Sequence, residues 1–238
     1  MDAAATGLML HSVEAVAQAP ALAASGLTRA FGSGRGVFGV DLKVELRQFL
    51  ALVGPSGAGK TTLLRMLAGI ERPDAGILTR FGDRNASARR GDTNVALVFQ
   101  RPRLVGRLSA VENVLAGRLG HLPRWQGFLK RFDAHDWTLA FECLDRVGLL
   151  SHAADRADRL SGGEQQRVAI ARALAQQPRV LLADEPVASL DPANARIVLS
   201  LLRRCADQGL AVVASLHQPE LAHEFADRVI ELQDGCLG

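Results

Sequence analysis

The stretch GPSGAGKT, residues 54–61, constrains the fold of this chain more than any other feature. It fits the pattern G-x-x-x-x-G-K-[ST], and it follows FLALV, a short apolar run typical of a strand buried on both faces of a parallel sheet. Glycines let backbone N–H groups wrap around phosphates, and the following helix points the positive end of its dipole at them. A strand, a glycine-rich turn and a helix in this order predict an α/β domain that holds a nucleotide's phosphates.

Two side chains in this stretch carry specific chemistry. Lys60 can reach the β- and γ-phosphates of a bound triphosphate, and the hydroxyl of Thr61 can hold Mg²⁺. A glycine-rich turn with a solvated lysine is the plainer interpretation, and the strand before and helix after count against it. The residues expected to surround the phosphates are Gly54, Pro55, Ser56, Gly57, Ala58, Gly59, Lys60, Thr61 and Thr62.

Polar residues follow three further apolar runs. Asp184 and Glu185 end VLLADE, Gln100 ends NVALVFQ, and His217 ends LAVVASLH. In open α/β sheets ligands bind at the carboxyl ends of the strands. We expect Asp184 to hold Mg²⁺ directly or through water, and Glu185 to polarise an attacking water.

The other two side chains fit the same reaction. The Gln100 amide can touch Mg²⁺ or the water, and His217 can contact the γ-phosphate and orient the water. Taken singly, the carboxylate pair and His217 are better explained by structural roles, and Gln100 fits either role equally well. Beside a phosphate loop they predict ATP hydrolysis with Glu185, His217 and Gln100 as catalytic residues and Thr61, Gln100 and Asp184 as metal ligands.

The remaining pattern predicts an interrupted α/β fold. From about residue 22, two stretches alternate apolar and polar positions, as half-buried antiparallel strands do. KTTLLRMLAGI after Gly59 and DPANARIVLSLLRRCADQG are helical, and the second places Ile197, Val198, Leu201, Leu202 and Cys205 on one face. Residues 101 to about 160 hold two helical segments and no strand, which indicates a helical insert.

Length and composition limit the alternatives. The 238 residues suit one large core, with 1–20 as a disordered extension, 21–238 as the folded domain and 123–132 as a loop or lid. A net charge of +3 is too small to argue for nucleic acid. The three cysteines are scattered, which favours a reducing compartment. No apolar stretch approaches the roughly 20 residues that cross a bilayer, so we expect a cytosolic protein.

A second glycine-containing helix start raises a separate problem. Ser161-Gly162-Gly163 opens an amphipathic helix, and such an entry is also an anion site. Because this helix belongs with the insert, we expect it not to reach the nucleotide of its own chain. Two copies related by a two-fold axis would place this helix start of one over the ATP of the other. The sequence therefore predicts a homodimer with two composite sites.

Six motifs follow the order and spacing of the ATP-binding-cassette family. They are GPSGAGKTT, Gln100, LSGGE, VLLADE, SLD (189–191) and His217. The chain resembles this family from about residue 22 to its end. The resemblance implies a P-loop NTPase core, an antiparallel β subdomain and an inserted α-helical subdomain. It also implies that Phe31 stacks on adenine and that Asp191 lies in the family's D-loop near the nucleotide. Glu164 replaces the usual glutamine of the signature, and ELRQFLALVG lacks a usual glycine.

The stretch FQRPRLVGRLSAVENVLAGRLG, residues 99–120, is similar to phosphonate-importer ATPases. That similarity implies integral membrane permease subunits, a periplasmic substrate-binding protein as an indirect partner, and a peripheral position on the cytoplasmic face of the inner membrane. It implies ATP and Mg²⁺ as cofactors and phosphonate uptake as the activity. A plainer interpretation is that residues such as Arg118 only pack the insert.

Three alternatives stay open at this point. The chain could energise another cargo, such as phosphate or amino-acid import or the export of lipoproteins or macrolides. It could be a soluble P-loop kinase, although a kinase has no use for Ser161-Gly162-Gly163. It could be a cassette ATPase of chromosome or ribosome type, although those need a long coiled coil or a second cassette.

Overall fold

A computed structural model describes residues 19–32, 34–84, 93–122 and 132–238 of the chain. Residues 1–18 of the expected N-terminal extension and 123–131 of the expected lid therefore lie outside the described residues. Among the described residues, no helix combines the length and the apolar character that crossing a bilayer requires.

A six-stranded sheet forms the centre of the molecule, in the order β5-β6-β7-β3-β8-β9. Five neighbouring strands are parallel, and β9 pairs antiparallel with β8. Every residue of β3, β6 and β7 is buried, which confirms the prediction drawn from their continuous apolar runs. The strands are β3 (Phe49–Val53), β5 (Val95–Val98), β6 (Val180–Ala183), β7 (Ala211–Ser215), β8 (Arg228–Gln233) and β9 (Cys236–Leu237).

A smaller antiparallel sheet has the order β2-β1-β4. The alternation predicted two of its strands, β1 (Leu22–Phe31) and β2 (Arg35–Val44), and the structure confirms both. The third, β4 (Ala75–Arg80), comes from a stretch where the sequence predicted no element. In the turn after β2 that lacks the usual glycine, Arg47 takes the left-handed φ of 66°. Its guanidinium donates to the carbonyl of Asp207 at 3.0 Å, which anchors the turn to the core.

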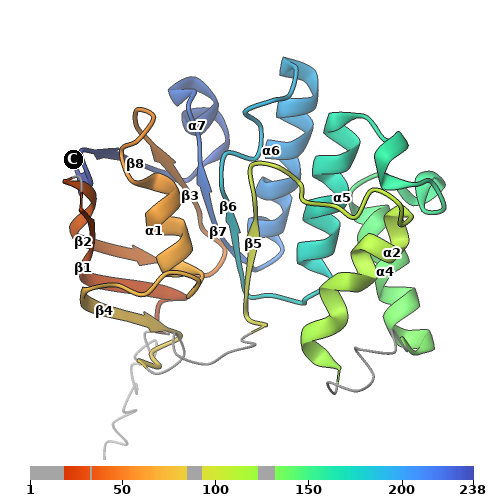
Figure 1. Ribbon diagram of the computed structural model, residues 1–238, viewed down its shortest axis with the longest axis horizontal. Helices are drawn as coiled ribbons and strands as arrows, with labels where there is room; N and C mark the ends of the chain where they lie inside the picture. Colours follow the sequence, from red (N-terminus) through yellow and green to blue (C-terminus); the bar gives the residue numbers. More distant parts are fainter. Residues whose placement is uncertain (1–18, 33, 85–92, 123–131) are drawn as a thin grey trace, which may run out of the picture.

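The helices form two groups (Figure 1). The first group packs on the central sheet and comprises α1 (Lys60–Leu67), α6 (Pro192–Asp207) and α7 (Pro219–Phe225). The second lies beyond β5, at the opposite end from the antiparallel sheet, and comprises α2 (Ala110–Leu115), η2 (Ala116–His121), α4 (Ala134–Arg146), η3 (Leu150–His152), η4 (Ala157–Arg159) and α5 (Gly162–Leu174). Parallel strands with helices packed against them, a separate antiparallel sheet and a helical group match the predicted fold class.

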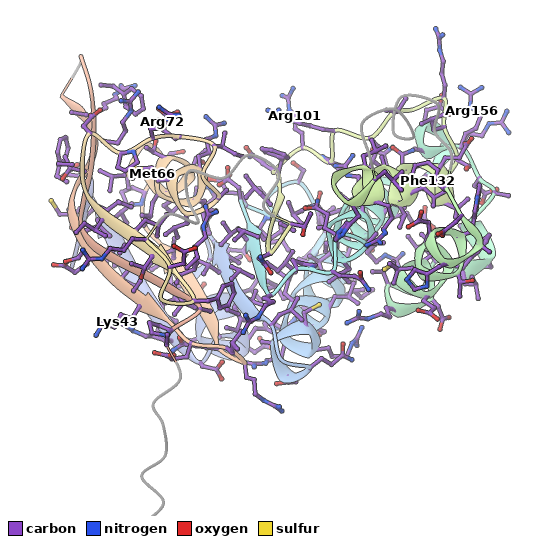
Figure 2. The ribbon with its side chains drawn as sticks, turned by 90° about the horizontal axis from the view of Figure 1, so that it is seen from below. Lys43, Met66, Arg72, Arg101, Phe132 and Arg156 are labelled. Atoms are coloured by element: carbon purple, nitrogen blue, oxygen red, sulfur yellow. The ribbon has the colours of Figure 1, made fainter. Side chains whose placement is uncertain are left out.

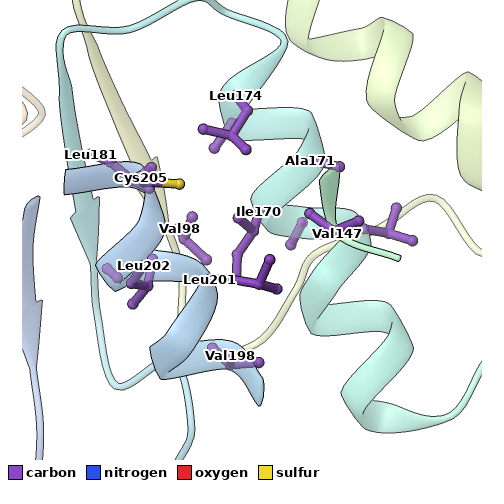
Figure 3. Close-up of a cluster of buried hydrophobic side chains, with 14 of the residues drawn as sticks. Val98, Val147, Ile170, Ala171, Leu174, Leu181, Val198, Leu201, Leu202 and Cys205 are labelled. Carbon is purple, nitrogen blue, oxygen red and sulfur yellow. The ribbon is translucent and has the colours of Figure 1, made fainter. Parts of the chain in front are cut away.

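The predicted apolar face of α6 is right for four of its five residues. Val198, Leu201, Leu202 and Cys205 are buried, and Figure 3 shows Leu201 beside Ile170 of α5. The prediction is wrong for Ile197, which is 44% exposed. A helix turns by about 100° per residue, so Ile197 lies outside the arc that the other four side chains share.

A buried ion pair holds the second helical group together. Arg118 donates from Nε to Asp136 Oδ1 at 2.8 Å, and both residues are less than a tenth exposed. The same guanidinium donates from Nη1 to the carbonyl of Ala175 at 3.1 Å and to the side-chain oxygen of Gln177 at 3.0 Å. Arg118 thus connects η2, α4 and the residues that follow α5.

Candidate nucleotide-binding and catalytic site

The glycine-rich loop joins the end of β3 to the start of α1. Gly54 has a φ of 146°, and a Cβ atom there would lie 2.1 Å from the carbonyl oxygen of Leu232 on β8. Only glycine permits this approach. Gly57 also has a positive φ, of 85°, but a Cβ there would meet no atom within 4 Å. The loop therefore packs tightly against β8 at Gly54, whereas the residues that follow, Pro55, Ser56 and Gly57, are exposed.

Lys60, the first residue of α1, lies beneath this loop. It is 4% exposed, and its Nζ donates to the carbonyls of Gly54 at 2.7 Å and Pro55 at 3.0 Å. Burial lowers the pKa of Lys60, and the nearby carboxylates of Glu185 and Asp184 oppose that shift. The direct hydrogen-bond partners of this buried ammonium group are neutral carbonyls, so an anion that enters the loop can add a directly bonded counter-charge.

Asp184 follows β6 and points at the start of α1. Its Oδ1 accepts from Thr61 Oγ1 at 2.9 Å and from Ser215 Oγ at 3.0 Å, and the residue is 7% exposed. The structure thus brings together Thr61 and Asp184, whose hydroxyl and carboxylate oxygens are the donors that Mg²⁺ prefers. Gln100 is exposed two residues beyond β5, and its neighbour Arg101 projects from the surface (Figure 2).

Glu185 and His217 meet above the sheet edge. His217 Nε2 lies 2.6 Å from Glu185 Oε1, and the two side chains are 38% and 15% exposed. Both line a cavity of about 120 Å³. The backbone of Glu185 takes a φ of 46°, uncommon for a residue with a side chain. Its N–H donates to Ser215 Oγ at 2.8 Å.

A second cavity, of about 210 Å³, joins the loop to the antiparallel sheet. Phe31 is 41% exposed at its edge, and the guanidinium of Arg29 lies 5.3 Å from the centre of that ring. An exposed aromatic face beside a phosphate loop can stack on a nucleobase. The cavity is lined by Phe31, Arg35, Gly36, Gly57, Gly59, Lys60, Thr61, Thr62 and Glu185, while Ala58 is buried below.

Ser161 caps α5, in the other helical group. Its N–H and hydroxyl donate to Glu164 Oε2 at 2.8 and 2.7 Å, and these bonds lower the pKa of Glu164. Neither cavity is lined by Ser161, Gly162 or Gly163. Figure 1 shows α5 and α1 separated by central strands. The structure therefore does not bring this helix start to the glycine-rich loop of the same chain.

Asp191, by contrast, lies close to this second helix start. Its Oδ1 caps α6 by accepting from the backbone N–H groups of Ala193 and Asn194, both at 3.0 Å. A Cβ on Gly163 would lie 2.6 Å from Asn194 Oδ1, so the starts of α5 and α6 touch. The hydrogen bonds from Asn194 lower the pKa of Asp191.

Sequence reasoning missed Ser215. This residue closes the apolar run AVVAS at the edge where Asp184 and Glu185 lie, and it contacts both of them. A hydroxyl at the end of an otherwise apolar strand was the only available signal.

A family model described as ABC transporter matches residues 37–188. The chain belongs to the ABC transporter family. The resemblance read from the motifs is therefore confirmed, and the matched region contains the glycine-rich loop, Gln100, Ser161 and the Asp184-Glu185 pair of this ABC chain.

Two relatives of this ABC chain have informative names. A hypophosphite import ATP-binding protein of Stutzerimonas stutzeri is 49% identical over 202 residues, covering 82% of this chain and 59% of the relative. A phosphonates import ATP-binding protein of Trichodesmium erythraeum is 47% identical over 212 residues, covering 87% of this chain and 82% of the relative. The chain thus spans less than two thirds of the first relative and most of the second.

A solved structure supports the same assignment. The dimeric post-hydrolysis state of the ATP-binding cassette MJ0796, bound to ADP and Pi, is 30% identical to this ABC chain, with a TM-score of 0.74. The match covers 91% of this chain and 96% of that one. The predicted fold class is confirmed.

Proposed function

We propose that this chain is the ATP-hydrolysing subunit of an ABC importer and that it couples ATP hydrolysis to uptake of phosphonates. One observation carries the catalytic part: the buried Lys60, the Thr61–Asp184 pair and the Glu185–His217 pair converge at one edge of the parallel sheet. The name of the Trichodesmium erythraeum relative and the wording of residues 99–120 support phosphonates as the cargo, whereas the Stutzerimonas stutzeri relative is named for hypophosphite. Transport of another cargo is the alternative.

The chain's own residues account for binding and orientation. The loop and Lys60 hold the triphosphate, and Phe31 stacks on adenine. Thr61, Asp184 and Gln100 would hold Mg²⁺, which neutralises charge developing on the phosphates. Glu185 accepts a proton from the attacking water, and His217 contacts the γ-phosphate and orients the carboxylate.

The second helix start completes the site in a dimer. Ser161, Gly162 and Gly163 of one copy cap the triphosphate held by the other, and Asp191 lies at the same interface because the starts of α5 and α6 touch. The dimeric cassette bound to ADP and Pi supports this arrangement. ATP then joins the two copies, and hydrolysis releases them.

The remaining assignments follow from the importer role. Residues 21–238 form the nucleotide-binding domain. The sequence predicts its helical subdomain at about 101–160, and the second helical group of the structure continues through α5 to Leu174. Permease subunits in the inner membrane bind the chain at the cytoplasmic face, and a periplasmic binding protein delivers the cargo. Nucleic acid is not among the proposed partners, since a net charge of +3 is too small to argue for it.

Two experiments test the proposal. Calorimetric titration of the Lys60→Ala variant should show ATP affinity reduced by roughly ten- to a hundredfold, because a hydrogen bond to a charged group contributes about 1.5–3 kcal/mol. Unchanged affinity would count against the ATP site.

The cargo is tested in proteoliposomes that contain the chain with the permease subunits of the proposed importer. ATP hydrolysis should rise when the periplasmic binding protein of that importer is loaded with a phosphonate and stay at the basal rate when it is offered phosphate or an amino acid. Stimulation by one of these other cargoes instead would replace the phosphonate assignment.

A further inference from the structure

Ser215 is a buried polar residue at the end of an apolar strand. It is 0% exposed, and the other four residues of β7 are alanine or valine. A buried hydroxyl without partners is unfavourable, so a serine is retained here only if its hydrogen bonds are satisfied.

The two hydrogen bonds of this hydroxyl have fixed directions. Asp184 as a carboxylate can only accept, so Ser215 Oγ donates to its Oδ1 at 3.0 Å. The backbone N–H of Glu185 can only donate, so Ser215 Oγ accepts from it at 2.8 Å. A single hydroxyl therefore orients the side chain of one acidic residue and the backbone of the next.

The backbone of Glu185 needs such a partner. Its φ of 46° lies in the left-handed region, which disfavours residues with a side chain and persists where the surroundings enforce it. The bond from Glu185 N–H to Ser215 Oγ is one such constraint, and it lies on the rigid central sheet. The direction in which Glu185 leaves β6, and hence its approach to His217, depends on that constraint.

Asp184 Oδ1 also accepts from the hydroxyl of Thr61, at 2.9 Å. Thr61 and Asp184 are both candidate metal ligands, whereas Ser215 is not. Ser215 therefore takes the place of the outer hydrogen-bond partner that commonly aims a metal-binding carboxylate.

We propose that Ser215 is a positioning residue that aims Asp184 at the divalent cation and holds Glu185 toward the attacking water. This inference rests on the proposed ATPase function. It adds a residue to which the sequence motifs assigned no role, and it gives one hydroxyl a contact with both acidic residues, Asp184 and Glu185.

The proposed role of Ser215 in aiming Asp184 at the cation is tested by measuring Mn²⁺ binding, which does not depend on ATP hydrolysis. The full chain carrying Glu185→Gln is loaded with ATP, and bound Mn²⁺ is measured by electron paramagnetic resonance. Adding Ser215→Ala should weaken Mn²⁺ binding by about tenfold or more, the usual effect of removing an outer-shell partner. ATP affinity in the absence of a divalent cation should be unchanged.

Two further variants separate positioning from packing. Ser215→Thr keeps the hydroxyl but adds a methyl group in a filled core, so it should lower the melting temperature and leave Mn²⁺ affinity at the parent value. Thr28→Ala is the control for loss of a bonded hydroxyl. Thr28 Oγ1 on β1 likewise donates one hydrogen bond and accepts one, to the carbonyl of Gly26 and from the N–H of Gly39, and it contacts neither Asp184 nor Glu185. Thr28→Ala should lower stability with no change in Mn²⁺ affinity.

The proposed role of Ser215 in holding Glu185 toward the attacking water is tested by measuring ATP hydrolysis in chains that retain Glu185. Ser215→Ala should lower kcat with little change in KM for ATP, whereas Thr28→Ala should change neither. If Ser215→Ala does not fold, the same measurements are made on Ser215→Cys. A thiol is close to a hydroxyl in size but forms only weak hydrogen bonds.

Two results would overturn the proposal. One is Mn²⁺ affinity and kcat within about twofold of the parent, the scatter between independent sites. The other is equal loss in the Thr and Ala variants, which would mean that packing matters rather than the hydroxyl. A failure of the ATPase function itself looks different, because the unmodified chain would then neither bind nor hydrolyse ATP.

Discussion

His217 Nε2 lies 2.6 Å from Glu185 Oε1, which joins the residues that follow β7 and β6. At this distance the imidazole fixes the direction of the carboxylate, and the two side chains form one unit facing a cavity of about 120 Å³. Because Glu185 is largely buried, few other groups compete for its oxygens. The pair is therefore where we expect water to be activated.

Replacing Glu185 by Gln tests this role. The amide keeps the shape but cannot accept a proton, so hydrolysis should fall by about 10²–10⁴-fold, while ATP binding is retained. Light scattering in ATP should then show a dimer, since the step that separates the copies is blocked. Glu224→Gln, at a surface ion pair with Arg196, is the control and should hydrolyse ATP normally. A monomer in ATP would contradict the composite site.

Gly54 and Gly57 provide a matched pair within the loop. Both have a positive φ, but only at Gly54 would a Cβ lie 2.1 Å from a backbone atom, the Leu232 carbonyl. Alanine at either position costs about 1–2 kcal/mol of backbone strain, and alanine at Gly54 adds the clash. Thermal unfolding should show a clearly larger loss for Gly54→Ala than for Gly57→Ala. Equal losses would mean that the loop is not wedged against β8.

The Arg118–Asp136 pair should matter far more for stability than a surface pair. Arg118→Ala leaves a buried carboxylate unpaired, which typically costs about 3–5 kcal/mol. Arg196→Ala breaks an exposed pair with Glu224, for which about 0–1 kcal/mol is usual. Urea unfolding of the two variants measures the difference, and similar values would show that the buried pair contributes little.

The lowered pKa of Glu164 predicts that the stability of the fold depends on pH. Hydrogen bonds from Ser161 hold its pKa below the ordinary value of 4.5. A carboxyl whose pKa is lower in the folded state stabilises the fold above its unfolded pKa, and this contribution is lost as pH falls through the folded pKa. The stability advantage of the parent over Glu164→Gln should therefore be full at pH values well above 4.5 and shrink on acidification below it. Unfolding measured along that range checks this, and a difference independent of pH would refute it.

The sequence predicted four strands of the central sheet, β3, β5, β6 and β7, and the residues at their ends for a simple physical reason, but it predicted neither β8 nor β9. Strands buried on both faces must be continuously apolar, and the carboxyl ends of parallel strands lie together. Asp184, Glu185 and His217 each follow such a strand, so their convergence could be expected before any coordinates.

Other features depend on contacts between distant segments. The Arg118–Asp136 ion pair joins two helices. The sequence periodicity of a helix shows which face is apolar, but it does not show which other helix lies beside it. The helix after Ser109 changes to a 3₁₀ turn at Ala116, and a Cβ on Gly117 would lie 2.2 Å from the Arg172 carbonyl. Ile197 fits an apolar pattern but faces outward, because the packing of α6, not the pattern, decides which arc is covered.

The contact between Gly54 and Leu232 also bears on how the protein is made. The glycine-rich loop follows β3, and among the strands that the structure describes β3 pairs with β7 and β8, which are synthesised after it. During translation the glycine-rich loop leaves the ribosome long before Leu232, whose carbonyl contacts Gly54. A nascent chain still lacking residue 232 would thus have the motif without its finished shape, and nucleotide capture would have to wait until nearly all of the described polypeptide had left the ribosome.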